Sequence, residues 1–286
     1  MKNILFATDF TNSTTPALDW VKLFARQYGS IVTVLHVFQP MIPDTTLPVM
    51  GDMGAGVAAS HDIEEISRQN LTEMVTRLSA EGINCQSEWR TGAVEDEILG
   101  AAREYQVDLI ITGRSDISTI FDRLAGSAAA DVAIDAPCPV LVIPIPHDGV
   151  GATRPTQIRS IVYTTQLEFD ENHILRQASA LAQTFNASLK LMKVDASNQP
   201  NVNADDQILR DIRREFGYEN IHVDKVESRT VSGGLLEYLE KHDTDLLIMT
   251  TRQRGFLDGL LNPSLTERMV LRSPIPLLVF HAKDGY

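Results

Sequence analysis

The chain has 286 residues, of which 43% are hydrophobic and 22% are charged, as expected for one large or two ordinary globular domains. Its 38 acidic and 25 basic residues give a formal net charge of −13, which repels phosphate backbones and argues against a nucleic-acid partner. The two cysteines stand in separate segments without a Cys-x-x-Cys spacing, which excludes a disulfide framework and a thiolate zinc site.

The apolar run near the N-terminus is too short for a signal peptide, and no segment approaches the roughly 18 apolar residues of a membrane span. Together with the cysteine usage, this predicts a soluble cytoplasmic protein with no membrane partner.

In the first half, short β-branched runs alternate with helical patterns, as in βαβ units around a parallel sheet. Each run is apolar on both faces, as expected where helices cover both sides of a sheet. The predicted strands are residues 3–8, 31–38, 84–90, 109–112 and 140–143. The predicted helices are residues 14–28, 61–81, 94–105 and 127–135.

The second half repeats this order after a polar stretch rich in glycine and proline, residues 146–157, which we predict to be a linker. Its predicted strands are residues 160–165, 188–194, 221–226, 246–250 and 277–280. Its predicted helices are residues 171–185, 204–216, 233–242 and 264–271. The prediction is an α/β protein with two tandem Rossmann-like domains, 1–145 and 158–286, each a five-stranded parallel sheet with helices on both faces.

The repeat can be followed residue by residue. Through the last segment of each half, an offset of 137 residues pairs positions without a gap, for example Pro137 with Pro274. Near the start of each half the offset is 157, which pairs Ile4 with Ile161. The first half therefore carries about 20 extra residues, which we expect in a loop at residues 39–60.

Several residues of the first half suit a ligand that carries phosphate. Asp9 ends the first predicted strand, where open α/β sheets bind ligands, although it can also cap the following helix. Gly113 permits a tight turn close to a ligand, or is simply a turn residue. Gly126 and Ser127 are predicted to open a helix whose free N–H groups suit phosphate oxygens, unless they are a plain helix start. His36 is predicted to be a packed core residue.

Together these features resemble the universal stress protein family. The run Gly-Arg-Ser-Asp at 113–116 is followed by nine residues and then by Gly126-Ser127, which matches the family's G-x2-G-x9-G-[ST] loop in spacing. Asp116 replaces the second glycine of that loop. Residues 136–144 are similar to the family's last strand. The resemblance extends over nearly the whole chain and implies an adenine nucleotide alpha hydrolase-like fold in each half.

The resemblance also implies an adenine nucleotide site in the first half, with the base near the first strand end and the phosphates near the glycine loop. Because Asp116 opposes a polyphosphate, the ligand is either ATP, with Arg114, Arg123 or Mg²⁺ offsetting the charge, or the less charged AMP. The implied site residues are Ala7, Thr8, Asp9, Val37, Thr112, Gly113, Arg114, Ser115, Asp116, Gly126, Ser127 and Ala128.

The second half has lost most of these residues, so one site per chain is predicted. Proline has no N–H for a phosphate, and threonine brings a branched side chain to the point of close approach. Arg252 and Arg254 form a basic patch on that loop, which either binds another anionic ligand or is simply solvated. At the positions of Asp9, Gly113, Asp116 and Gly126 stand Gln166, Thr250, Gln253 and Pro263.

The function that follows is a nucleotide-binding stress-response or signalling protein. One alternative is a slow ATPase, although no strong general base and no Walker lysine is present. The other is a scaffold or small-molecule carrier without nucleotide, in which residues 41–56 are a lid or an open loop. Because single-domain relatives often dimerise through the last strand, we expect strands 140–143 and 277–280 to pair within this chain, which would cover both apolar edges. Further assembly into a homodimer stays open.

Overall fold

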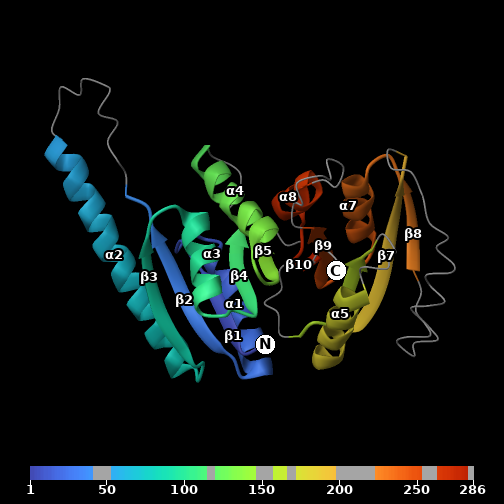
Figure 1. Cartoon of the computed structure of the whole chain (residues 1–286), viewed down its shortest axis with the longest axis horizontal. Helices are drawn as coiled ribbons and strands as arrows, with labels where there is room; N and C mark the ends of the chain where they lie inside the picture. The colour runs from blue at the N-terminus through green and yellow to red at the C-terminus, as the bar shows by residue number, and fades with distance from the viewer. Residues whose placement is uncertain are drawn as a thin grey trace.

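The computed structural model describes residues 1–40, 53–114, 120–145, 157–165, 172–197, 223–252 and 263–282, with the side chains of 53–59, 120–127, 172, 252 and 263–264 left out. The described strands form one sheet of ten, with helices on both faces (Figure 1). The predicted helix at 204–216 and nearly all of the predicted linker lie outside the described residues.

Elements of the first half follow the predicted order. The strands are β1 (Asn3–Ala7), β2 (Ile31–Phe38), β3 (Cys85–Thr91), β4 (Leu109–Arg114) and β5 (Val140–Pro144). The helices are α1 (Thr14–Tyr28), α2 (Met53–Ala80), α3 (Val94–Glu104) and α4 (Ile120–Asp135).

Elements of the second half repeat that order. The strands are β6 (Ser160–Thr164), β7 (Ser188–Ala196), β8 (Val223–Ser228), β9 (Leu246–Arg252) and β10 (Leu277–Ala282). The helices within its described residues are α5 (Asn172–Phe185), α7 (Val231–Lys241) and α8 (Pro263–Arg272). None of the described helices combines the length and the apolar character that a membrane crossing requires.

The sheet order is β3-β2-β1-β4-β5-β10-β9-β6-β7-β8. Within each half all strand pairs are parallel, and the halves are joined by the antiparallel pair β5 and β10. Leu278 lies opposite Leu141, its own counterpart at the 137-residue offset, so a pseudo-twofold axis passes between them. The predicted pairing of the last strands is confirmed.

Two apolar layers cover the sheet, because successive side chains of a strand point to opposite faces. Phe6 of β1 packs in the layer under α1, α2 and α5, whereas Leu5 packs in the layer under α3, α4, α7 and α8. Each layer runs through both halves. On the first face Phe24 of α1 lies 5.1 Å from Phe185 of α5, ring centre to ring centre, so the halves share a core as well as a sheet.

Two helices begin earlier than the sequence pattern predicts. The predicted loop at 39–60 is wrong from Met53 onward, because α2 begins there and projects beyond the sheet (Figure 1). Residues 53–56 of the segment suggested as a lid or an open loop are therefore helical, and its residues 41–52 lie outside the described residues. Likewise α4 begins at Ile120, so Gly126 and Ser127 lie inside a helix and do not open it. Alanines beside the glycines in both segments, and Leu124 in α4, favour helix strongly enough that isolated glycines do not end it.

Candidate functional site

A cavity of about 550 Å³ lies at the carboxyl ends of β1, β2 and β4, between α3 and α4. Its position follows from the sheet order: the chain runs outward from β1 to one side and from β4 to the other, which leaves a crevice at this switch point. The structure brings together in its lining the predicted residues Ala7, Thr8, Asp9, Val37, Thr112, Gly113 and Ala128.

The loop after β1 is held by short polar contacts. Asp9 Oδ1 accepts hydrogen bonds from the Thr11 backbone N–H at 3.0 Å and from the Thr11 hydroxyl at 2.7 Å. The Thr8 hydroxyl accepts from the Phe10 N–H at 3.1 Å and lies 2.9 Å from the Thr14 hydroxyl. Asp9 therefore lines the cavity and also orders the loop at its edge. The Thr8 hydroxyl ties the same loop to Thr14, the first residue of α1.

Gly113 is required by close packing against this loop. A Cβ atom at this position would lie 2.6 Å from Ser13 Oγ and 2.7 Å from the Ser13 carbonyl oxygen. Real Cβ atoms do not approach backbone oxygens this closely, so only glycine lets the start of α1 lie on the end of β4. Gly113 thus has a structural role in addition to its place in the cavity wall.

His36 is a packed core residue, as predicted. It lies on the opposite face of β2 from Val37, because strand side chains alternate. Its ring stacks on Phe10 at 4.7 Å and lies 5.1 Å from the Trp89 ring. Burial lowers the pKa of His36. Because a carbonyl oxygen can only accept, Nδ1–H donates to the Thr8 carbonyl, 2.8 Å away. This bond holds the end of β1 to β2.

Some predicted residues do not appear in the lining. The buried guanidinium of Arg114 points away, toward the second half, where Nη1 donates to the Val270 carbonyl of α8 at 2.8 Å. Ser115 and Asp116 lie outside the described residues, as do the side chains of Arg123 and Ser127. The Arg114 contact means that its charge stabilises the interface between the halves.

Two acidic residues that the sequence analysis missed stand in the cavity wall. Glu95 belongs to the first turn of α3, and Asp131 belongs to α4. Burial raises the pKa of Glu95, and the nearby charge of Asp131 raises it further. Burial and then the charge of Glu267, on α8, raise the pKa of Asp131. No sequence signal singles out these two acids, because α3 and α4 each carry several acidic residues and neither Glu95 nor Asp131 belongs to the loop motif.

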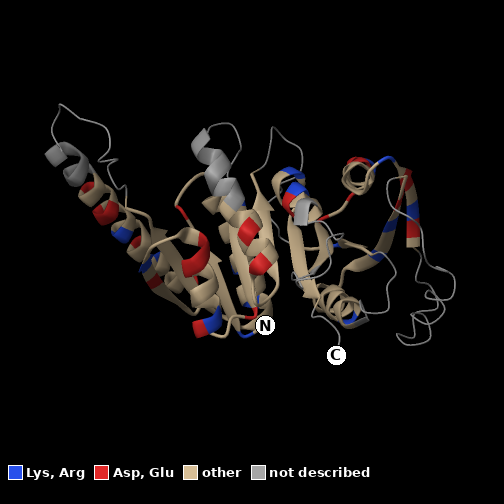
Figure 2. Cartoon of the chain, turned by 45° about the horizontal axis from the view of Figure 1, so that its top comes forward, with Lys and Arg blue, Asp and Glu red and all other residues tan. Residues whose placement is uncertain are grey.

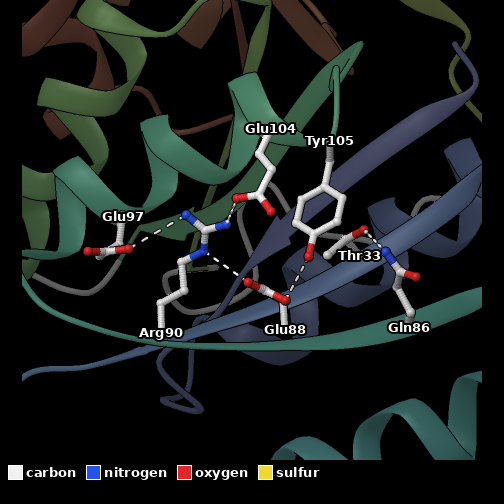
Figure 3. A network of polar contacts seen from close by, with 7 residues as sticks. All are labelled: Thr33, Gln86, Glu88, Arg90, Glu97, Glu104 and Tyr105. Atoms are coloured by element: carbon white, nitrogen blue, oxygen red, sulfur yellow. Dashed lines mark hydrogen bonds and ion pairs between the residues drawn. The ribbon is translucent and has the colours of Figure 1, made fainter.

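A network around Arg90 ties α3 to the edge of the sheet (Figure 3). Arg90 of β3 donates through Nε to Glu88 at 3.0 Å, and its other nitrogens pair with Glu97 at 3.6 Å and with Glu104. The Tyr105 hydroxyl donates to Glu88 at 2.8 Å. Since Glu97 and Glu104 lie near opposite ends of α3, the network holds the whole helix, and with it one wall of the cavity.

At the corresponding place in the second half, the helix lies directly on the strand. A Cβ atom at Gly234 of α7 would lie 2.7 Å from Val194 Cγ1. Val194 is the counterpart of Val37 at the offset of 157, yet it is 2% exposed, whereas Val37 is half-buried and lines the cavity. The backbone of α7 thus lies against the valine whose counterpart in the first half lines the cavity.

The acidic pair is replaced as well. At the offset of 137, Ser232 stands for Glu95 and Arg268 stands for Asp131. Arg268 Nη1 donates to the Ser232 hydroxyl at 3.2 Å, which links α8 to α7. The same two positions therefore carry two negative charges in one half and a bonded serine and arginine in the other.

The described part of the chain contains no preformed set of ligands for a metal ion. There, no three His, Cys, Asp or Glu side chains are arranged so that they could hold an ion. A Mg²⁺ ion at the cavity would thus need further oxygen ligands, which nucleotide phosphates could supply.

Comparison with known proteins places both halves in one family. The model of the universal stress protein family matches residues 1–144 and again residues 158–281. The chain is 26% identical over 147 residues to universal stress protein YxiE of Bacillus subtilis, which covers 49% of this chain and 97% of that protein. A universal stress protein of Thermus aquaticus is 27% identical over 143 residues, 50% of this chain and 98% of its own.

Solved structures share the complete tandem fold. A universal stress protein from Archaeoglobus fulgidus superimposes with a TM-score of 0.73 at 21% identity, covering 99% of this chain and 97% of that one. A protein of the same description from Pseudomonas aeruginosa gives a TM-score of 0.64 at 16% identity, covering 98% and 93%.

Proposed function

This chain belongs to the universal stress protein family, and we propose that its first half binds one adenine nucleotide in the cavity between α3 and α4. We further propose that this binding acts in stress response or signalling by changing the conformation of the protein or its choice of partner. The observation that carries the proposal is the cavity itself. It opens at the carboxyl ends of the strands, at the switch point, and Gly113 lies in its wall.

The lining suits the parts of such a ligand. Val37 and Ile98 offer an apolar wall for a flat base. Thr8 and Thr112 offer hydroxyl groups, and the backbone at Gly113 can approach a ribose or a phosphate without a side chain in the way. The family loop continues from Gly113 toward α4, on the side where the resemblance puts the phosphates.

One site per chain is proposed, with residues 1–145 and 158–286 as domains joined by the linker 146–157. The support is the contrast between the halves: Thr250 replaces Gly113, and α7 lies directly on Val194. A nucleotide in the second half would have to move this helix, which packs on a buried core.

The test is calorimetric titration with ATP, ADP and AMP, with and without magnesium. The informative variant is Ala128→Leu, which places in the cavity wall the residue that the second half carries as Leu265. Leucine favours helix almost as well as alanine, so α4 should persist while the cavity is filled. Wild-type protein should bind one equivalent, and Ala128→Leu should bind at least about tenfold more weakly, the loss of roughly 1.4 kcal/mol.

The matched control is Ala180→Leu, the same change at an exposed position of α5 in the second half, which should leave binding unchanged. Equal binding by wild type and Ala128→Leu would refute the proposed site, and two equivalents per chain would refute the single site. Prolonged incubation with ATP separates the alternatives: ADP that forms with wild type and not with Ala128→Leu would make the first half a slow ATPase.

A further inference from the structure

The described lining of the cavity is acidic. Asp9, Glu95 and Asp131 all contribute to it, and no lysine or arginine stands among the described lining residues. Resting on the proposed nucleotide site, we propose that Glu95 and Asp131 make this site select adenine compounds by charge. It binds the nucleoside and the monophosphate in preference to the uncomplexed triphosphate.

The two carboxylates lie on neighbouring walls of one small space. Glu95 is in the first turn of α3 and Asp131 is in α4, and these helices pack beside each other. Figure 2 shows acidic residues on both helices in the part of the molecule that encloses the cavity. A ligand inside about 550 Å³ lies within one Debye length, about 10 Å, of both groups, so salt screens them little.

Neither carboxylate is neutralised by an ion pair within the described residues. Their other charged neighbours are also acids. Burial raises both pKa values most, and these acids raise them further: Asp131, Asp135 and Asp96 act on Glu95, while Glu267 and Asp135 act on Asp131. The ionised form of each carboxyl is therefore disfavoured in this wall, and a further negative charge in the cavity is repelled by both groups, with no opposing charge among the described lining residues.

The ligand's chemistry decides how much repulsion it meets. A nucleoside is neutral, and its ribose hydroxyls and amino group can donate hydrogen bonds to carboxylates, which accept only. A triphosphate brings about four negative charges near the same groups, and each of these charges is repelled by each carboxylate. The acidic pair thus attracts one end of the nucleotide and repels the other.

The second half shows that the fold does not require this acidic pair. Ser232 and Arg268 occupy the same two positions and are hydrogen bonded at 3.2 Å. The helices α7 and α8 keep the packing of α3 and α4 with that neutral and positive pair in place. The packing of the two helices therefore does not require the acids, which we assign to the cavity.

The experiment titrates adenosine, AMP and ATP without divalent ions into wild type, Glu95→Gln and Asp131→Asn. Wild type should bind adenosine and AMP more tightly than ATP. Each substitution should tighten ATP binding roughly three- to tenfold, the effect of about 1 kcal/mol per removed charge, and should weaken adenosine binding or leave it unchanged, because an amide accepts hydrogen bonds less strongly than a carboxylate. Saturating Mg²⁺ neutralises part of the charge of the triphosphate and should therefore reduce the difference between the affinities of wild type for ATP and for AMP.

Asp96→Asn is the matched control, because it removes the same charge from the neighbouring, exposed position of α3, outside the cavity. It should change ATP affinity less than either cavity variant. Equal changes for adenosine and ATP, or no change in their ratio, would overturn the charge selection while leaving nucleotide binding in place. Failure of wild type to bind any of the three compounds would overturn the proposed function and the selection with it.

Discussion

The two halves of this chain share a strand order and a core, and they differ at the carboxyl ends of their strands. In the first half Gly113 and Val37 face a cavity. In the second, the counterpart Thr250 accommodates a neighbouring side chain, since its hydroxyl lies 3.2 Å from the Tyr163 hydroxyl, and Val194 is covered by α7. The same sheet forms in both halves because its strands are buried in both. A cavity at the strand ends depends instead on a few positions that must carry a small side chain or none.

Two hydrogen bonds between the halves have acceptors at equivalent positions but donors of different types. Arg114 donates to the Val270 carbonyl near the end of α8, and His281 donates to the Ala133 carbonyl near the end of α4, at 3.0 Å. Val270 and Ala133 are counterparts at the offset of 137. Both carbonyls belong to the last turn of a helix, where intrahelical donors are missing. Each half thus caps a helix of the other, with a different side chain.

The largest expected effect comes from giving the first half the second half's residue, Gly113→Thr. The new Cβ would lie within 2.7 Å of the Ser13 carbonyl oxygen, so the start of α1 must move. We expect the free energy of unfolding to fall by about 3 kcal/mol, the upper range for overpacking, and nucleotide binding to be lost. Urea unfolding and calorimetry measure the two effects.

The reverse change, Thr250→Gly, is the control. It removes the contact with Tyr163 and should cost about 1 kcal/mol without creating a nucleotide site, because α7 still covers Val194. If Gly113→Thr were as stable as wild type, the close packing against Ser13 would not be what requires glycine.

A smaller effect is expected at the interface. Arg114→Met keeps most of the buried volume and removes the charged donor to Val270, so the free energy of unfolding should fall by about 2 kcal/mol. The matched variant Thr251→Val changes the counterpart of Arg114, which is also buried, and should cost less. Equal losses in urea unfolding would show that Arg114 contributes no more to the interface than its counterpart does.

The smallest effect depends on pH. Burial lowers the pKa of His281 below its ordinary 6.5, and the charge of Asp135 opposes this only in part. A depressed pKa means that the neutral ring stabilises the fold fully above about pH 6.5 and that this stability is lost as pH falls through the lowered value. His281→Gln keeps an N–H donor for Ala133 without a titrating group.

Urea unfolding at pH 7 and pH 5 tests this difference. Wild type should lose about 1 kcal/mol more between the two values than His281→Gln, and His36, whose pKa is also lowered, contributes equally to both proteins. An identical loss in the two proteins would mean that His281 does not titrate on unfolding in this range.

Much of the fold was readable from local pattern. Alternating strand and helix periods predict nearly every described element, and the 137-residue offset predicts the tandem arrangement. The pairing of β5 with β10 was predicted from the resemblance, because single-domain relatives often dimerise through the last strand, and from two apolar edge strands that need cover. Asp9 was predicted for the site because it ends the first strand, Gly113 because a glycine permits close approach to a ligand, and Val37 through the resemblance.

The first turns of α2 and α4 were not readable, because glycines inside alanine- and leucine-containing stretches leave the helix start undetermined by local preference. Sequence patterning also said nothing of where the Arg114 side chain points. Its partner lies on a helix of the other half, 156 residues away along the chain.

What the sequence determined by itself is the periodicity of burial, and with it two parallel half-sheets and the edge of the first half-sheet at which we predicted a ligand site. Tertiary structure alone decided that Glu95 and Asp131 face the same cavity and that α7 lies against Val194 at Gly234. The physical reason is the separation along the chain over which each effect acts. Strand and helix periods act between neighbours in the chain, whereas the charge and the volume of a cavity depend on how separate helices pack on the sheet.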